Sequence, residues 1–392
     1  MFGQETQIGF WLKPGAPIKD VKGTLLMAVL GGTLVSCTTT QEYNLVQQLS
    51  LTPVSFKDVP GWKQDHHHLA LSSFKKSCLK LLQKPFSITK WNKVPGRAGT
   101  WTNSCVSANT LGIISRRKAR KFFENHFRPH KVTGYGLFTG YYEPTIGGSL
   151  TRIGRYQFPI YEKPAGWPPT QSRKFSVSGR SKSGVLKYYP TRKEIDDGIL
   201  EDKAKVLAWA SSPVDVFFLH IQGSGIIKVR DNKIMRLGFA GHNGHKYTSI
   251  GKVLKSKGEI PSEKLSMQSI RAWLLANPMK AMSVMHKNAR YIFFRKLKSA
   301  GPLGAQGVSL TPGRSLAIDP KFIPYGTPIW LDFQAPMFKK STFQRLLIAQ
   351  DTGAAIRGPV RGDIFFGRGT LAAKQAGHLK HRGKVFLLIP QD

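Results

Sequence analysis

The feature that most constrains the fold is a change of residue pattern near residue 130. Beyond it the chain is rich in Gly, Pro, Tyr and Thr, and apolar residues recur in short runs between turn residues. Clear examples are residues 132–142, 315–319, 328–332, 346–350 and 384–389. Short alternating runs are typical of half-buried strands, and frequent turn residues keep those strands short. The pattern predicts a mainly β fold, as a barrel or a sandwich.

Four other stretches have the apolar spacing of helices. They are residues 69–82, 115–126, 201–209 and 266–276. The first two precede the strand-rich region, and we expect them to flank a core rather than to form it. At 392 residues the chain exceeds the roughly 150 residues typical of one domain, so two packed domains are expected. The sequence has no repeat of the kind that indicates a solenoid or a propeller.

The charge balance is strongly basic. Lys and Arg number 59 against 22 Asp and Glu, which leaves a net charge of +37. Such a charge attracts polyanions, so a nucleic-acid-binding protein is one candidate class. The basic residues are scattered, however, and no recognisable nucleic-acid module accompanies them. No nucleic-acid partner is expected, and an acidic polymer or an anionic surface accounts for the charge equally well.

The amino-terminal region has the pattern of an export signal. Lys19 precedes an apolar run over residues 23–35, which is short for a membrane span but typical of the core of a signal peptide. The residues ahead of Cys37 resemble a bacterial lipobox, in which the Cys becomes lipidated. We therefore expect residues 1–37 to form a signal and lipoprotein segment and the polar residues 38–55 to form a tether. A buried apolar strand is the alternative for the apolar run.

Cysteine and histidine usage does not indicate a metal site. Cys78 and Cys105 are the only thiols besides Cys37, and their spacing fits no metal motif. Two cysteines in an exported chain are expected to pair in an oxidising compartment. Three consecutive histidines, at 66–68, cannot all face one ion from an extended chain. Neither a metal nor a cofactor is therefore expected.

Three aspartates near the carboxyl terminus are candidates for chemistry, because acidic residues are scarce in this chain. Asp319 and Asp351 each end a predicted strand, and Asp363 follows a turn. Asp363 lies between Gly362 and the apolar residues 364–366. Apolar neighbours desolvate a carboxyl group and raise its pKa, as a general acid near neutral pH requires. A turn or cap residue is the alternative for each aspartate.

These aspartates belong to an ordered set of segments. The set resembles the 3D domain, named for three aspartates, and more closely the membrane-bound lytic murein transglycosylase A (MltA) family. The resemblance covers most of the chain. The matching segments are residues 60–62 with Asp65, 139–144, 159–161, 190–192 with 195–196, 218–225, 241–244 with Tyr247, 291–294, 313–319, 323–328, 349–353 and 361–367.

The resemblance implies a double-psi β-barrel assembled from both sides of an inserted β-domain, with a groove between them. On this reading, residues 56–130 form the first part of the barrel domain with its helices. Residues 131–285 form the insertion, and residues 286–392 form the second, catalytic part of the barrel. A monomer is expected, in the periplasm and anchored to the outer membrane.

The same resemblance implies the reaction and its residues. The substrate is the glycan strand of peptidoglycan, cleaved between N-acetylmuramic acid and N-acetylglucosamine with formation of 1,6-anhydro ends. Asp363 matches the catalytic acid, and we assign Asp351 and Asp319 to holding the site in shape. Sugar rings require aromatic platforms and hydrogen-bonding groups. The predicted substrate-binding residues are Thr139, Tyr141, Tyr142, Gln222 and Ser224.

Two other functions are also compatible with the sequence. A glycoside hydrolase would use water and a second carboxylate roughly 5 to 10 Å from the acid, a distance that the sequence does not give. Barrels related to barwin and expansins bind polysaccharide without cleaving it, and Asp363 would then only orient a sugar. The complete set of three aspartates together with the insertion favours the lytic enzyme.

Overall fold

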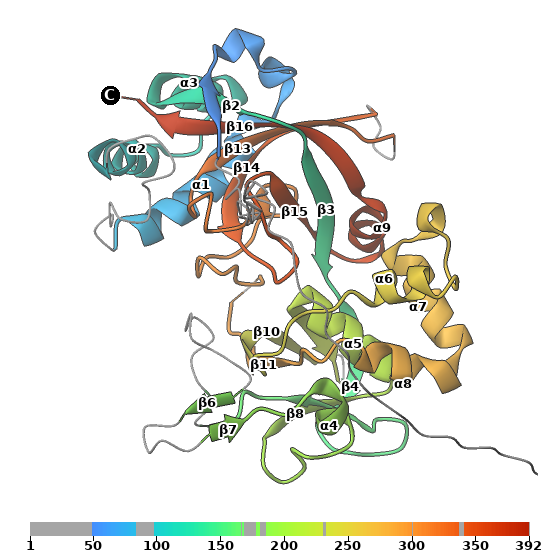
Figure 1. Ribbon diagram of the computed structural model, residues 1–392. Helices are drawn as coiled ribbons and strands as arrows, with labels where there is room; N and C mark the ends of the chain where they lie inside the picture. The colour runs from blue at the N-terminus through green and yellow to red at the C-terminus, as the bar shows by residue number, and fades with distance from the viewer. Residues whose placement is uncertain are drawn as a thin grey trace, which may run out of the picture. The chain divides into compact units, whose positions relative to one another are not determined.

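The computed structural model describes residues 49–83, 98–165, 167, 178–180, 186–229, 233–299, 301–336 and 341–391 (Figure 1). The predicted signal segment, with Cys37, lies outside the described residues. Within the described ranges, no helix combines the length and the apolar character needed to cross a membrane.

A closed six-stranded barrel forms the first part of the fold. Its strands are β3 (Gly136–Glu143), β12 (Ser315–Ala317), β13 (Pro328–Gln334), β14 (Thr342–Asp351), β15 (Arg361–Arg368) and β16 (Lys380–Pro390). They pair in the order β16, β13, β14, β12, β15, β3, and β3 pairs with β16 to close the ring. The pairs β12–β14 and β3–β15 are parallel, and the others are antiparallel. The predicted mainly β fold is confirmed.

Alternate residues of the barrel strands fill its core. Phe138, Phe333 and Phe343 stack in a row, with ring centroids 5.3 and 4.9 Å apart. Helix α9 (Thr370–His378) packs against β3 and β15. It approaches β3 so closely at Gly140 that a Cβ atom there would lie 2.7 Å from the backbone of Ala376. A side chain at this position would therefore push the helix away.

In the described part of the chain, two strands and three helices precede the barrel strands. Strand β1 (Leu51–Pro53) pairs with β2 (Phe127–Val132), which extends the sheet beyond β16. Helices α1 (His67–Leu81), α2 (Ala98–Thr110) and α3 (Arg116–His126) pack against the barrel and share a second core with it. Short 3-10 helices lie at Phe56–Asp58 and Trp62–Gln64. The helices predicted at 69–82 and 115–126 are confirmed.

A buried ion pair links the segment before α1 to the barrel. Both guanidinium nitrogens Nη1 and Nη2 of Arg314 donate to the carboxylate of Asp65, at 2.7 and 2.8 Å. The N–H of Leu346 donates to the same carboxylate at 3.0 Å. Burial alone would raise the pKa of Asp65, but these donors hold it below its ordinary value. A buried pair with this bidentate geometry is strongly destabilised when one partner is removed.

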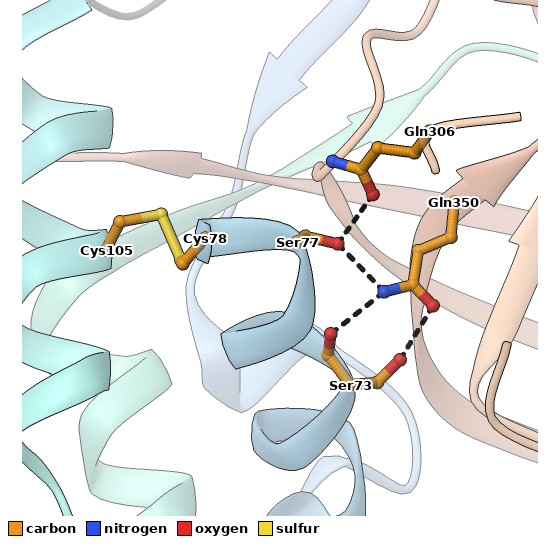
Figure 2. The surroundings of a disulfide bond; sticks show 6 residues. All are labelled: Ser73, Ser77, Cys78, Cys105, Gln306 and Gln350. Carbon is orange, nitrogen blue, oxygen red and sulfur yellow. Dashed lines mark hydrogen bonds between the residues drawn. A yellow bond between two sulfur atoms is a disulfide. The ribbon is translucent and has the colours of Figure 1, made fainter. Parts of the chain in front are cut away.

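The side chain of Gln350 links α1 to the end of β14 (Figure 2). Its oxygen accepts from the hydroxyls of Ser73 and Ser315, at 2.9 and 2.6 Å. Its nitrogen donates to the carbonyl of Ser73 and to the hydroxyl of Ser77, at 2.9 and 2.8 Å. Ser77 in turn donates to Gln306 at 2.8 Å. All four hydrogen-bonding positions of the buried amide are used, so its orientation is determined.

The second sheet has six strands in the order β11, β10, β9, β4, β8, β5. Their bounds are β4 Thr145–Ser149, β5 Phe158–Tyr161, β8 Val206–Ala210, β9 Ser224–Lys228, β10 Ile234–His242 and β11 Ile292–Lys296. A separate hairpin joins β6 (Ser178–Arg180) and β7 (Leu186–Tyr188).

Among the residues that the structure describes, five helices and one 3-10 helix accompany this sheet. They are α4 (Arg192–Asp196), α5 (Pro213–Gln222), α6 (Ile250–Ser256), α7 (Met267–Ala276), α8 (Pro278–His286) and the 3-10 helix Ser262–Lys264. The helix predicted at 266–276 is confirmed. Helices α5, α6, α7 and α8 share an apolar core of their own.

Two predicted local structures are wrong. The helix expected at 201–209 is a turn followed by β8, with Asp202 at a positive φ of 60°. Its apolar residues fill the core beneath paired strands, and strand pairing with β5 and β4 overrides the local helical spacing. The tether expected at 38–55 ends earlier, because Leu51–Pro53 forms β1 and pairs with β2.

Cys78 and Cys105 form a disulfide that joins α1 to α2, with their Cα atoms 5.1 Å apart. Both side chains are fully buried. We predict that replacing both with Ala lowers the free energy of unfolding by about 3 kcal/mol, because the bond closes a loop of 27 residues in the unfolded chain. Urea unfolding of the two proteins measures the difference.

The double variant also supplies its own control. A reductant should lower the stability of the unmodified protein toward that of the variant and leave the variant unchanged. Equal unfolding midpoints for the oxidised protein and the variant would show that the disulfide adds no stability.

Candidate active site

Strand pairing brings two of the three predicted aspartates together. Strand β12 lies between β14 and β15. Its residue Ala317 is opposite Asp351 on the β14 side and opposite Asp363 on the β15 side. The two aspartates therefore lie on either side of Ala317, although a loop separates them along the chain. On β3, Thr139 is the residue opposite Asp363.

Asp363 lies on the face of β15 that points away from the main barrel core. Its neighbours Ile364 and Phe366 belong to that core, and successive side chains of a strand alternate between faces. The side chain is half-buried. The hydroxyl of Thr139 donates to its Oδ1 at 2.5 Å. Arg361, two residues earlier on β15, donates to the same Thr139 hydroxyl at 2.7 Å.

The electrostatic surroundings favour the protonated form of Asp363. Burial raises its pKa to about 6, and the charge of Asp351 contributes in the same direction. Arg361 and the hydrogen bond from Thr139 oppose the shift without cancelling it. A carboxyl group with a pKa near 6 holds a proton in part of the molecules near neutral pH. Asp363 can therefore act as a general acid.

Asp351 is surrounded by hydrogen-bond donors. The phenol of Tyr141 donates to its Oδ2 at 2.7 Å, and the N–H groups of Ala305 and Thr352 donate to its Oδ1 at 2.9 Å each. Burial raises the pKa of Asp351, and these three donors lower it. Burial and the Asp351 charge also raise the pKa of Tyr141 well above its ordinary value, which keeps the phenol a neutral donor. Burial has the larger effect, so on balance the pKa of Asp351 lies above its ordinary value, while the three donors stabilise its carboxylate form.

Asp319 stabilises the loops beside the site. Its Oδ2 accepts from the N–H of Gly358 at 2.9 Å, and its Oδ1 accepts from the N–H of Lys321 at 3.1 Å. It is 3% exposed. The N–H of the preceding residue, Ile318, donates to the carbonyl of Asp351 at 2.9 Å. Asp319 thus holds the segment after β12 in contact with both the β14 end and the loop that leads into β15.

Comparison with known proteins identifies the family. The model of the MltA specific insert domain matches residues 137–295, and the model of the 3D domain matches residues 314–389. The membrane-bound lytic murein transglycosylase A of Escherichia coli (strain K12) is 35% identical over 282 residues, which cover 69% of this chain and 71% of that protein. The protein of the same name from Vibrio cholerae is 33% identical, over 65% of this chain and 66% of that one.

This chain belongs to the MltA family. Solved structures agree. The membrane-bound lytic murein transglycosylase from Agrobacterium tumefaciens superimposes with a TM-score of 0.77 at 32% identity, over 87% of this chain and 98% of that one. MltA from Neisseria gonorrhoeae, in a monoclinic form, gives 0.72 at 34% identity, over 87% and 92%. E. coli MltA with bound chitohexaose gives 0.62 at 27% identity, over 88% and 95%.

The five residues predicted to bind sugar occupy different surroundings in this MltA fold. Thr139 and Tyr141 lie in the aspartate site, where their hydroxyls are bonded to Asp363 and Asp351. The next residue of β3, Tyr142, is half-buried and packs against the barrel core.

The other two lie in the inserted part of the chain. Gln222, at the end of α5, accepts from the backbone N–H of Tyr142 at 3.0 Å. Ser224 is 7% exposed on β9, opposite Gly238 of β10. Gln222 therefore reaches the end of β3, whereas strand pairing in the second sheet accounts for the burial of Ser224.

Two residues near Asp363 were not predicted from the sequence. Arg361 lies on the same face of β15 as Asp363. Its position two residues before Asp363 is the sequence pattern from which this could have been predicted. Tyr247 lies between β10 and α6, in the inserted part of the chain. Burial raises its pKa, a hydrogen bond with Ser249 lowers it, and the Asp363 charge raises it further. No spacing in the sequence relates Tyr247 to Asp363.

Among the described residues, no group of three or more His, Cys, Asp and Glu side chains is arranged to hold a metal ion. Of the three consecutive histidines, His67 is fully buried. It packs against the rings of Trp62 and Trp330, with centroids 4.3 and 6.5 Å away. The histidine run therefore contributes to the core beneath the helices.

The raised pKa of Asp363 predicts a pH-dependent stability. Between about pH 4 and pH 6 the folded protein retains a proton on Asp363 that the unfolded chain has released. The ionised side chain therefore destabilises the folded state above about pH 6 and has no such effect below about pH 4. Asn cannot ionise. We expect Asp363→Asn to be more stable than the unmodified protein at about pH 8, by on the order of 1 to 3 kcal/mol, and equally stable at about pH 4.

Thermal unfolding at the two pH values measures this difference. Asp319→Asn is the matched control, since the amide replaces one of the two oxygens that accept from the backbone N–H groups of Gly358 and Lys321, and its Tm should fall at both pH values. A lower Tm for Asp363→Asn at about pH 8 would contradict the assignment of a destabilised carboxylate at this position.

Proposed function

We propose that this chain is a peptidoglycan lytic transglycosylase with Asp363 as its catalytic acid and base. One observation carries the proposal: Asp363, with a pKa raised to about 6, lies beside a second carboxyl group whose two oxygens already accept three hydrogen bonds. Membership of the MltA family supports the reaction class. The bound chitohexaose of the E. coli relative supports a glycan of β-linked amino sugars as substrate.

The proposed reaction needs one carboxyl group. Protonated Asp363 donates to the glycosidic oxygen between N-acetylmuramic acid and N-acetylglucosamine, and the bond to C1 of the muramoyl sugar breaks. The Asp363 carboxylate then accepts the proton of that sugar's C6 hydroxyl. The C6 oxygen attacks C1 and closes the 1,6-anhydro ring. The proton that leaves Asp363 is thus replaced, and water does not enter the product.

The surroundings of Asp351 argue against a hydrolase. An inverting hydrolase needs a second carboxylate that activates water, and a retaining one needs a second carboxylate that attacks C1. Both oxygens of Asp351 already accept hydrogen bonds, from Tyr141, Ala305 and Thr352. These donors hold the carboxylate in place and occupy the oxygens with which it would have to contact a water molecule or C1. Its negative charge instead supports the raised pKa of Asp363.

Substrate contacts are proposed at the end of β3. Tyr142 keeps part of its ring exposed, and its backbone is held by Gln222, so it could support the apolar face of a sugar without moving. The charge of Arg271 lowers the pKa of Tyr142, against a larger effect of burial, which places a cation near this ring. Arg271 is paired with Asp215, whose charge acts on Tyr142 in the opposite direction, so the two charges partly compensate at this ring.

Asp363→Asn tests the catalytic assignment. The amide keeps the shape of the side chain but cannot release a proton to the leaving oxygen. We expect release of anhydromuropeptides from purified sacculi to fall by at least about 10⁴-fold, because the same group serves both steps. Mass spectrometry of the released products measures the rate and the class of the reaction.

Asp351→Asn provides the comparison for this experiment. Removing its charge lowers the pKa of Asp363, so the alkaline side of the rate profile should move to lower pH in a variant that remains active. Near-normal anhydro product from a folded Asp363→Asn variant would transfer the acid role to Asp351. Glycan binding without any product from the unmodified protein would favour the non-catalytic polysaccharide-binding class.

We further propose that the protein is anchored to the outer membrane through a lipid on Cys37. The apolar run at 23–35 and the position of Cys37 directly after Ser36 support this, and the relatives are named membrane-bound. We expect Cys37→Ala to leave the membrane fraction while retaining activity on added sacculi. Immunoblots of fractionated cells measure the distribution. A variant that stays with the membrane would indicate an uncleaved signal anchor instead.

A further inference from the structure

A chain of two hydrogen bonds connects a cation to the catalytic carboxyl group. Nη2 of Arg361 donates to the hydroxyl oxygen of Thr139 at 2.7 Å, and that hydroxyl lies 2.5 Å from Oδ1 of Asp363. Arg361 and Asp363 are two residues apart on β15, and Thr139 is opposite Asp363 on β3. All three side chains therefore project from the same face of two paired strands.

The chemistry of these groups determines the direction of the hydrogen bonds. A guanidinium group only donates, so Thr139 must accept from Arg361 with one of its lone pairs. A donor that carries a positive charge polarises the hydroxyl, which makes it a stronger donor and a weaker acceptor. The single hydrogen of Thr139 is therefore directed to Oδ1 of Asp363. Oδ1 is an acceptor in this arrangement.

Both members of the chain are held in place by the backbone. Nη1 of Arg361 donates to the carbonyl of Leu137 on β3 at 3.1 Å and to the carbonyl of Gly362. Thr139 is β-branched, and such side chains have few accessible χ1 angles. The guanidinium plane and the hydroxyl therefore keep their orientation whether or not Asp363 is charged.

We propose that Arg361 and Thr139 are positioning residues that reserve Oδ1 of Asp363 as an acceptor and leave Oδ2 to carry the catalytic proton. This inference rests on the proposed role of Asp363. It deepens that role, because the proton leaves from Oδ2 to the glycosidic oxygen and returns to Oδ2 from the C6 hydroxyl. The carboxyl group need not rotate between the two steps. Thr139 acts on the acid, and the sugar is bound by other groups.

Four titratable groups among the described residues act electrostatically on Asp363 or are acted on by it. Arg361 on β15 and Asp351 on β14 carry charge and have opposite effects on its pKa. Tyr141 on β3 and Tyr247 ahead of α6 have raised pKa values and stay neutral across the range in which Asp363 titrates. Loss of the Thr139 or Arg361 contact should therefore appear as a single shift of the Asp363 titration.

The test measures the pH dependence of anhydromuropeptide release by the full-length protein and four variants. Thr139→Val keeps the shape of the side chain and removes the donor, and Thr139→Ser keeps the donor. Arg361→Gln removes the charge that polarises the hydroxyl. Thr145→Val is the matched control, since Thr145 is exposed on β4.

We expect Thr139→Val to lower kcat at least tenfold and to move the alkaline side of the rate profile upward by about one pH unit, because the carboxylate loses a hydrogen bond. Thr139→Ser should restore both properties. Arg361→Gln should shift the profile in the same upward direction, opposite to Asp351→Asn. Thr145→Val should match the unmodified protein in rate and in profile.

Three results would overturn the inference. One is a Thr139→Val variant with unchanged kcat and profile. Another is a variant with a higher KM and an unmoved profile, which would make Thr139 a substrate contact. The third is a loss that Thr139→Ser does not restore, which would indicate packing alone. Failure of the proposed function is seen separately, as normal activity of Asp363→Asn or as absence of anhydro ends from the unmodified protein.

Discussion

The parallel pairing of β3 with β15 is the interaction on which the barrel and its site both depend. Strand β3 closes the ring by pairing with β15 on one edge and with β16 on the other. The same register sets Thr139 opposite Asp363 and carries Tyr141 to Asp351. A slip of one residue would turn every side chain of β3 to the opposite face, so it would expose Phe138 and separate both hydroxyls from the aspartates.

Buried polar contacts behind the strands explain how two neighbouring carboxyl groups keep different hydrogen-bond partners. The Asp65–Arg314 pair and the amide of Gln350 attach the helices to β12 and β14. Gln350 directly precedes Asp351, and the loop that includes Ala305 supplies one of its donors. Asp351 is thus held by three donors, while Asp363 accepts one hydrogen bond, from Thr139. Burial raises the pKa of both groups; the three donors oppose this effect at Asp351, and Arg361 and Thr139 oppose it at Asp363.

The features that could be predicted from the sequence are those that leave a pattern in neighbouring residues. Short apolar runs predicted the barrel strands, helical spacing predicted α1, α3 and α7, and the Gly and apolar neighbours of Asp363 predicted a desolvated carboxyl group. The same signal failed at 201–209, where a short apolar run is compatible with either structure. The partners of the site could not be predicted, because Thr139 and Asp363 are 224 residues apart and Asp65 and Arg314 are 249 apart. Which atom a hydroxyl contacts is set by strand register, which the sequence does not state.

The wide separation of β3 from its partners has a consequence for the order of folding. Strand β3 ends at Glu143 and β15 begins at Arg361, so the ring cannot close until the whole insertion and most of the carboxyl-terminal strands are available to fold. Contacts between distant segments form slowly, since the intervening chain must first lose its freedom. The core beneath the helices includes Trp330 and Phe386, so it cannot be completed before these carboxyl-terminal segments fold. We therefore expect the site to be among the last parts to assemble, so a partly folded chain would have no means of cutting a glycan.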